Sequence, residues 1–77
     1  MTEPLDNQND QNAGERSRVM AREVERLREL ASWYREFAER AGNPTIWERR
    51  LRTAEDLEAT AERIDRSIAA GRLARAI

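Results

Sequence analysis

The chain has 77 residues, of which 38% are charged and 5% aromatic, and its net charge is −1 at pH 7. This composition is typical of long solvated helices or a coiled coil, and the length allows one small domain at most. Because the chain has no Cys and no His, it excludes disulfides and thiolate metal sites and lacks the commonest general base. No apolar run approaches the roughly 20 residues that a membrane-spanning helix needs.

The N-terminal segment is polar and acidic. Residues 1–13 contain the run Asn-Gln-Asn-Asp-Gln-Asn, which has no apolar side chain to bury, so we expect a disordered tail there. The segment also lacks the basic flank and apolar stretch of a signal peptide, which favours a cytoplasmic protein. A first helix is predicted over about residues 14–41, with Asn12 as a candidate cap and Glu15 three residues later.

A loop is predicted at residues 42–44. Gly42 stands where a helix commonly ends in a left-handed backbone conformation, and Pro44 prevents the helix from continuing. One continuous helical rod would instead place Pro44 inside a helix, at a cost of about 3 kcal/mol. We therefore expect the chain to turn back on itself here.

The second helix is predicted over about residues 45–70. It begins either with the capping box Thr45-Ile46-Trp47-Glu48, or slightly earlier with Asn43 as the cap and a proline in the first turn. Gly71 is the candidate stop. Residues 71–77 carry two arginines, and we expect them to form a frayed basic tail or to extend the helix.

Both predicted helices carry a seam of mostly apolar residues that recur at intervals of three and four. The seams are Met20, Val24, Leu27, Ala31, Tyr34, Ala38 and Ala41 in the first helix, and Ile46, Arg50, Ala54, Leu57, Ala61, Ile64 and Ile68 in the second. Folded antiparallel, they pair in order from Ala41 with Ile46 to Met20 with Ile68, and large residues face small ones through the middle. The predicted fold class is all-α, an antiparallel two-helix hairpin like a coiled coil, which pairs into a helical bundle by oligomerisation or partner docking.

A two-helix hairpin has no enclosed core, so apolar residues outside the seams stay exposed unless something covers them. The first helix has a second apolar stripe beside its seam, formed by Val19, Leu30, Trp33 and Phe37. The second helix has two further apolar residues near its start, Trp47 and Leu51. Fully burying each large side chain is worth roughly 1.5–3 kcal/mol. These residues either wrap the tip of the hairpin or form an interface with a second copy or another protein, and we favour the interface.

Arg50 occupies a seam position with Ala38 opposite. A buried, unpaired guanidinium is prohibitively costly, so Arg50 must extend to solvent or meet a carboxylate such as Glu36 or Glu39. It is either an arginine lying along the edge of the seam or a polar residue that sets register or partner choice, as in coiled coils. In the second case Arg50→Leu would raise thermal stability and loosen oligomer specificity.

Two charged ridges are candidate sites. The second helix carries an acidic ridge, Glu55, Glu58, Glu62 and Asp65. Di-iron sites in helical bundles need Glu-x-x-His motifs, so we interpret this ridge as a solvated face and expect neither metal nor cofactor. The first helix carries a basic ridge, Arg18, Arg22 and Arg26. Glutamates interleave with it, which argues against nucleic-acid binding.

We therefore expect a non-enzymatic protein–protein interaction module (an adaptor, accessory subunit or regulator) that acts through the loop end of the hairpin. The expected interface residues are Leu30, Trp33, Phe37, Trp47, Arg50 and Leu51. The expected partner is a second copy, in a dimer or small oligomer, or another protein. Two alternatives stay open: an antitoxin-like regulator whose disordered tail folds over a target, and a nucleic-acid-binding protein that uses the basic ridge.

Overall fold

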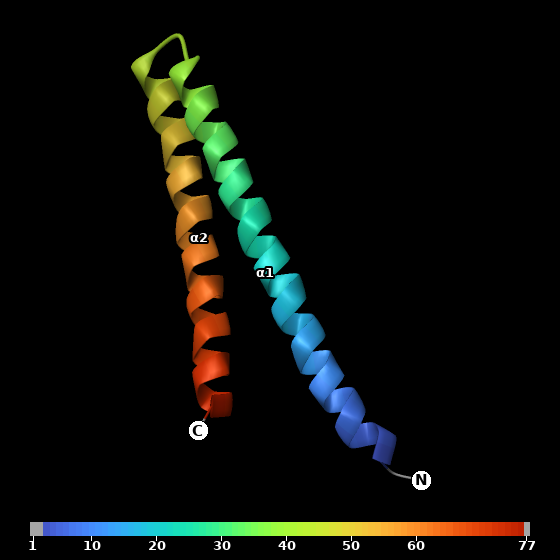
Figure 1. Ribbon diagram of the computed structural model, residues 1–77. Helices are drawn as coiled ribbons and strands as arrows, with labels where there is room; N and C mark the ends of the chain where they lie inside the picture. Colours follow the sequence, from blue (N-terminus) through green and yellow to red (C-terminus); the bar gives the residue numbers. More distant parts are fainter. Residues whose placement is uncertain (1–2, 77) are drawn as a thin grey trace.

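The protein is a hairpin of two long helices. The computed structural model describes the backbone of residues 3–76 and the side chains of residues 14–71. Helix α1 (Glu3–Glu39) and helix α2 (Pro44–Ala76) are joined by a short loop. They run antiparallel and side by side (Figure 1), in a rod with extents of 65 × 23 × 12 Å. The predicted all-α helical hairpin is confirmed.

The end of α1 differs from the expected one. The backbone N–H of Arg40 donates to the carbonyl of Phe37 at 3.2 Å, and that of Ala41 donates to the carbonyl of Ala38 at 3.0 Å. These bonds join residues three apart, so the last turn of α1 is tighter than an α-helix. It satisfies helix-end carbonyls that would otherwise accept hydrogen bonds from backbone N–H groups at a left-handed residue. No glycine in the described part of the chain has a positive φ. The expectation of a left-handed Gly42 is therefore wrong.

Asn43 caps the start of α2. Its side-chain Oδ1 accepts a hydrogen bond from the backbone N–H of Ile46 at 2.9 Å, and its carbonyl accepts the first helical bond, from Trp47, at 3.1 Å. Pro44 is the first helical residue, where its missing N–H needs no partner. Of the two predicted starts, the one with Asn43 as the cap is confirmed, and the capping box that begins at Thr45 does not start the helix.

The outer end of α1 also differs from the expected one. The helix begins at Glu3 and not near residue 14, so residues 3–13, expected to form a disordered tail, are its first turns and Asn12 is not a cap. Pro4 is compatible with this start because it lies in the first turn, where its missing N–H breaks no helical bond. Gly14 within a helix costs about 1 kcal/mol relative to Ala, which is too little to end it.

The outer end of α2 extends through Gly71 to Ala76. Gly71 has no positive φ, so it does not act as a stop. The residues that follow it are Arg-Leu-Ala-Arg-Ala, all strong helix formers, which explains why these residues extend the helix, one of the two predicted outcomes, and do not form a frayed tail. Ile77 lies outside the described residues.

The two predicted seams form the contact between the helices. Among residues 14–71 every buried apolar side chain belongs to a seam, and these are Val24, Ala31, Ala38, Ala54, Ala61 and Ile68. Val24, Ala61 and Ile68 form a core cluster on which the half-buried side chains of three further seam residues pack, Met20, Leu27 and Ile64. Residues that the predicted register sets opposite one another therefore lie in one cluster.

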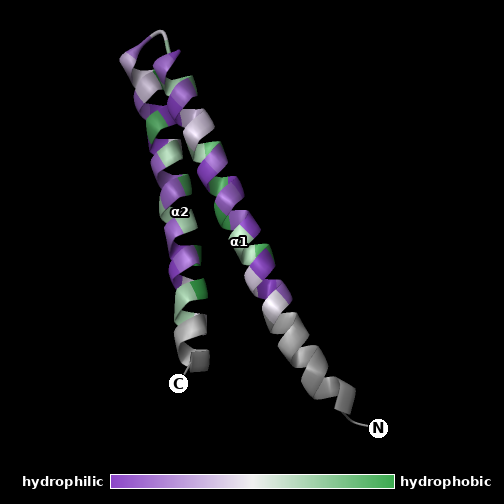
Figure 2. Cartoon of the chain, in the orientation of Figure 1, coloured by the Kyte–Doolittle hydropathy of each residue, from purple (hydrophilic) through white to green (hydrophobic). Residues whose placement is uncertain are grey.

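The size of the seam residues changes along the hairpin. Four of the six buried side chains are alanines, and in the predicted register they face larger residues, such as Leu57 opposite Ala31. Toward the chain ends the seam has large residues on both helices, such as Val24 with Ile64. Because the distance between packed helices depends on the side chains at the contact, this change explains why α1 and α2 lie close near the loop and diverge toward the termini (Figure 1). Hydrophobic residues recur along both helices between hydrophilic ones (Figure 2).

The backbone at Gly42 gives a first test. A Cβ added there meets nothing within 4 Å, and φ is not positive. We therefore expect Gly42→Ala to leave the free energy of unfolding unchanged or to raise it by up to about 1 kcal/mol, because alanine restricts the unfolded chain. Thermal unfolding followed by circular dichroism checks this. A fall in Tm would show that Gly42 needs the left-handed conformation after all.

The alanine seam gives a second test with a matched control. Ala61 is fully buried between the helices, whereas Ala59 on the same helix is exposed. Ala61→Leu forces extra volume into the contact and is expected to lower the free energy of unfolding by about 1–3 kcal/mol. Ala59→Leu is expected to change it by no more than about 0.5 kcal/mol. Equal effects in denaturant titrations of the two variants would contradict the seam.

Candidate functional site

The seam divides the surface of the hairpin into two sides, and ion pairs mark one of them. Residues that directly follow a large seam residue project to this side, because a helix turns by about 100° per residue. Nη2 of Arg28 lies 3.3 Å from Oδ2 of Asp65, and the guanidinium of Arg35 is paired with the carboxylate of Glu58. The second pair repeats the first after seven residues on each helix, as expected for a seam in one register.

This side is acidic. With the neighbouring outward positions it carries seven acids (Glu25, Glu39, Glu48, Glu55, Glu58, Glu62 and Asp65) against three arginines (Arg18, Arg28 and Arg35). We call it the acidic side. The side chains of the two interhelical pairs are about half exposed, and ion pairs in contact with solvent contribute little to stability. They therefore indicate register more than they stabilise the fold.

Arginines partly neutralise the predicted acidic ridge, which lies on this side. A hydrogen bond to the carboxylate of Glu58, and the negative charge of that group, raise the pKa of Arg35 above its ordinary value. Glu62 accepts a hydrogen bond at 2.8 Å from Arg66, one helical turn away. No group of three or more His, Cys, Asp or Glu side chains in the described part of the chain could hold a metal ion.

The opposite side is apolar near the loop. Residues that directly precede the seam alanines project there, which places Leu30 and Phe37 of α1 beside Thr53 and Thr60 of α2. Trp33 lies one helical turn from both Leu30 and Phe37, and Ile46 lies seven residues before Thr53, nearer the loop. We call this the aromatic side, formed by Leu30, Trp33, Phe37, Ile46, Thr53 and Thr60. Trp33 is 51% exposed, Leu30 41% and Ile46 37%, so large apolar side chains face solvent here.

Three rings hold one another in place on α1. The rings of Trp33 and Phe37 are stacked, with centroids 4.8 Å apart and planes at 25°. Tyr34 meets Trp33 edge-on at 5.0 Å, and it contacts Phe37 at 6.4 Å. Such pairs contribute about 0.5–1.5 kcal/mol beyond the area that they bury. The cluster therefore presents Trp33 to solvent in a defined orientation.

Arg50 joins this cluster from α2. Its Cζ lies 3.4 Å from the centroid of the Phe37 ring, and its Nη1 donates a hydrogen bond to the backbone carbonyl of Phe37 at 2.8 Å. Of the alternatives that the sequence left open for Arg50, an ion pair with Glu36 or Glu39 is not formed among the described residues, and the end of α1 instead offers a carbonyl and a ring face. A cation at a helix C-terminus is stabilised by the unpaired carbonyls and the helix dipole. Arg50 thus ties the two helices together beside the loop.

The structure separates the six predicted interface residues. Leu30, Trp33 and Phe37 lie together on the aromatic side, and Arg50 contacts Phe37. Trp47 lies instead at the tip of the hairpin, 43% exposed, where it lines a shallow hollow with residues 41–44. Leu51 directly follows Arg50 along the chain, so it lies half-buried on the acidic side.

Ile46, Thr53 and Thr60 belong to the aromatic side, although sequence reasoning did not select them for it. Ile46 was assigned to the seam opposite Ala41, yet it is exposed. In the sequence, Ile46 lies seven residues before Thr53 and fourteen before Thr60. This spacing indicates that Ile46 shares their side of the helix and does not belong to the seam. The helical repeat assigns the corresponding seam position to Trp47, seven residues before the buried Ala54.

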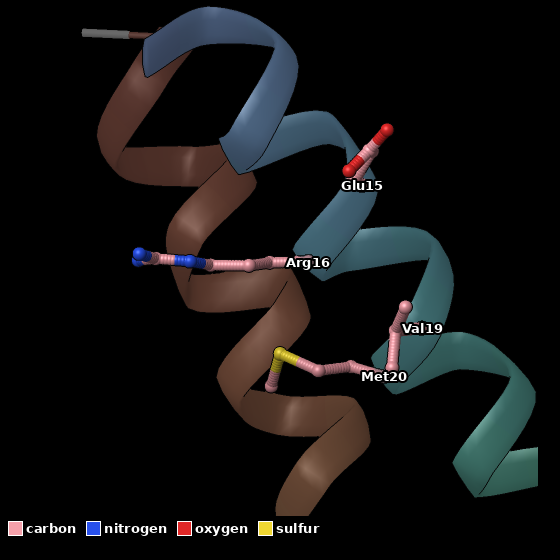
Figure 3. Close-up of a pocket in the computed structure, with 4 residues that line it drawn as sticks. All are labelled: Glu15, Arg16, Val19 and Met20. Atoms are coloured by element: carbon pink, nitrogen blue, oxygen red, sulfur yellow. The ribbon is translucent and has the colours of Figure 1, made fainter. Parts of the chain in front are cut away.

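A second hollow lies far from the loop, where the helices diverge. It is lined by Glu15, Arg16, Val19 and Met20. Arg16 and Met20 extend toward α2, whereas Glu15 extends away from it (Figure 3). Val19 is 61% exposed, and among the described residues that line the hollow it is the one large apolar side chain turned to solvent.

Comparisons with known proteins add no assignment. No family model matches the chain, and no curated protein or solved structure matches it. No helix in the described part is long and apolar enough to cross a membrane. The basic ridge at Arg18, Arg22 and Arg26 is exposed on α1, and nucleic-acid binding through it stays a prediction.

The contacts of Arg50 give a third test. Arg50→Leu removes a charged hydrogen bond and the interaction with the Phe37 ring, so we expect the free energy of unfolding to fall by about 1–3 kcal/mol. Arg52→Leu, at an exposed position on the same helix, is the control and is expected to have little effect. Urea titrations of both variants check this. A gain in stability for Arg50→Leu would instead support the earlier idea of a destabilising polar residue that sets specificity.

Proposed function

We propose that the protein is a non-enzymatic interaction module that binds a second polypeptide chain through the loop-end half of its aromatic side. The observation that carries this proposal is the solvent exposure of Trp33, Leu30 and Ile46, which the helical repeat places on one side of the hairpin, in a chain of which 38% is charged. Contiguous apolar patches on small proteins mark interaction sites, and exposed tryptophan is enriched among residues that dominate binding energy.

The rigidity of the patch supports the same function. Trp33 is stacked on Phe37, and the Phe37 ring in turn contacts the guanidinium of Arg50. A partner therefore meets side chains whose conformations are already restricted, which lowers the entropy lost on binding. Trp47 at the tip adds a further exposed apolar surface at the edge of the proposed interface.

The lack of His and Cys in the sequence supports an interaction role over catalysis. The chain has no His and no Cys, and no buried side-chain nitrogen or oxygen among the described residues lacks a hydrogen-bond partner. Perturbed polar groups of that kind are typical of active sites. We also propose a cytoplasmic location, since a chain without cysteine has no need of an oxidising compartment.

Position-specific photo-crosslinking in the source cell tests the proposal. A benzophenone amino acid replaces Ile46 on the aromatic side or, as the control, exposed Ala59 on the outer face of α2. We expect a discrete protein adduct from position 46, none from position 59, and loss of the adduct when Trp33→Ala is added. An adduct of twice the 9.0 kDa chain identifies a second copy as the partner. The proposal fails if position 46 gives no adduct, or if both positions give the same adducts.

A further inference from the structure

The charge of the aromatic side indicates what kind of chain binds there. The outward positions along the whole length of this side carry five exposed arginines, Arg16, Arg26, Arg40, Arg49 and Arg63. The same outward positions carry two acids, Glu23 and Asp56. The ion pairs formed among residues 14–71 use acids of the other side, Asp65, Glu58 and Glu62. The aromatic side is thus apolar and cationic, and the acidic side is its electrostatic opposite.

We propose that the aromatic side binds an acidic amphipathic helix, which completes a three-helix bundle. This inference deepens the proposed function and rests on it. A partner helix with an apolar stripe flanked by glutamate or aspartate would place its stripe against Leu30, Trp33 and Phe37 and its carboxylates beside the arginines. A second copy fits less well, because docking the same side of another hairpin sets ten arginines against four acids across one interface, and like charges so placed are repulsive.

The surface between α1 and α2 on this side suits a helix. In the row along this side, Glu23 lies fourteen residues before Phe37 on α1, which is about 21 Å of helix. Across the seam, Thr53 and Thr60 donate their hydroxyl hydrogens to carbonyls of their own helix, those of Arg49 and Asp56, at 3.0 Å each. Both hydroxyls are therefore satisfied within α2. A helix can cover them without leaving an unpaired donor.

Calorimetric titration of the full chain with two synthetic peptides tests the proposal. The probes are amphipathic helices of about three heptads with leucine at the seam positions. One carries glutamate and the other lysine at the flanking positions, and like charge keeps each peptide from pairing with itself. We expect the glutamate peptide to bind at least about tenfold more tightly than the lysine peptide, and its affinity to fall as salt concentration rises.

Two variants place this binding on the aromatic side. Leu30→Glu puts a carboxylate into the apolar row and is expected to weaken binding of the glutamate peptide at least about tenfold. Ser32→Glu adds the same charge two residues away on the acidic side and is expected to leave binding within about twofold. Circular dichroism of both variants checks that the helices form. Should Leu30→Glu fail to fold, Arg26→Glu with Arg63→Glu takes its place, and it is expected to shift the preference toward the lysine peptide.

Several results would overturn the inference. These are equal affinity for both peptides, no binding of either peptide, and binding that Leu30→Glu and Ser32→Glu reduce alike. Sedimentation that shows a dimer dissociated by Leu30→Glu but not by Ser32→Glu would make a second copy the occupant instead. Each of these results leaves the proposed function standing if position 46 still crosslinks to a protein. Absence of that crosslink removes the proposed function itself, so the two failures are distinguishable.

Discussion

The close approach of α1 and α2 at four buried alanines is the constraint on which the rest of the structure depends. Ala31, Ala38, Ala54 and Ala61 are almost fully buried, and each small side chain lets the opposite helix come near. Alanine, however, removes little apolar area from water, so this contact specifies geometry more than it supplies free energy. The large seam residues that face the alanines, such as Leu27 and Leu57, stay half-buried at the edges.

That geometry also determines what the surface can do. The alanines lie between the helices. The residue that directly precedes each alanine in the sequence therefore projects to the aromatic side, and the residue that directly follows each large seam residue projects to the acidic side. One side therefore collects Leu30, Trp33 and Phe37, and the other collects the paired charges such as Arg28 with Asp65. Arg50 links the seam to the aromatic side, since its guanidinium closes the end of α1 and covers the Phe37 ring. The spacing of three and four residues therefore determines both the contact between the helices and the residues exposed on each side.

The periodicity of the sequence was enough to predict the hairpin and both seams apart from Ile46, and local chemistry offered Asn43 as one of two possible caps of the second helix. Three features depended on geometry instead. The acceptor of Arg50 is a carbonyl thirteen residues away, in the last turn of α1, and Arg50 reaches it only because the two helices pack side by side. The same turn removes the need for a left-handed Gly42. The third is the seam position nearest the loop, where neither of the two adjacent candidates is buried: Ile46 is 37% exposed and Trp47 43%.

The register of the seam is the central claim, and contacts between methyl groups measure it most directly. In a nuclear Overhauser spectrum of the methyl-labelled protein, this register predicts cross-peaks from Val24 to Ile64 and Ile68, and from Leu27 to Ala61, in keeping with their common cluster. A register shifted by one heptad would instead connect Val24 with Leu57 and Leu27 with Ala54. Cross-peaks of that second kind, without the first, would contradict the alanine contact and with it the division of the surface into two sides.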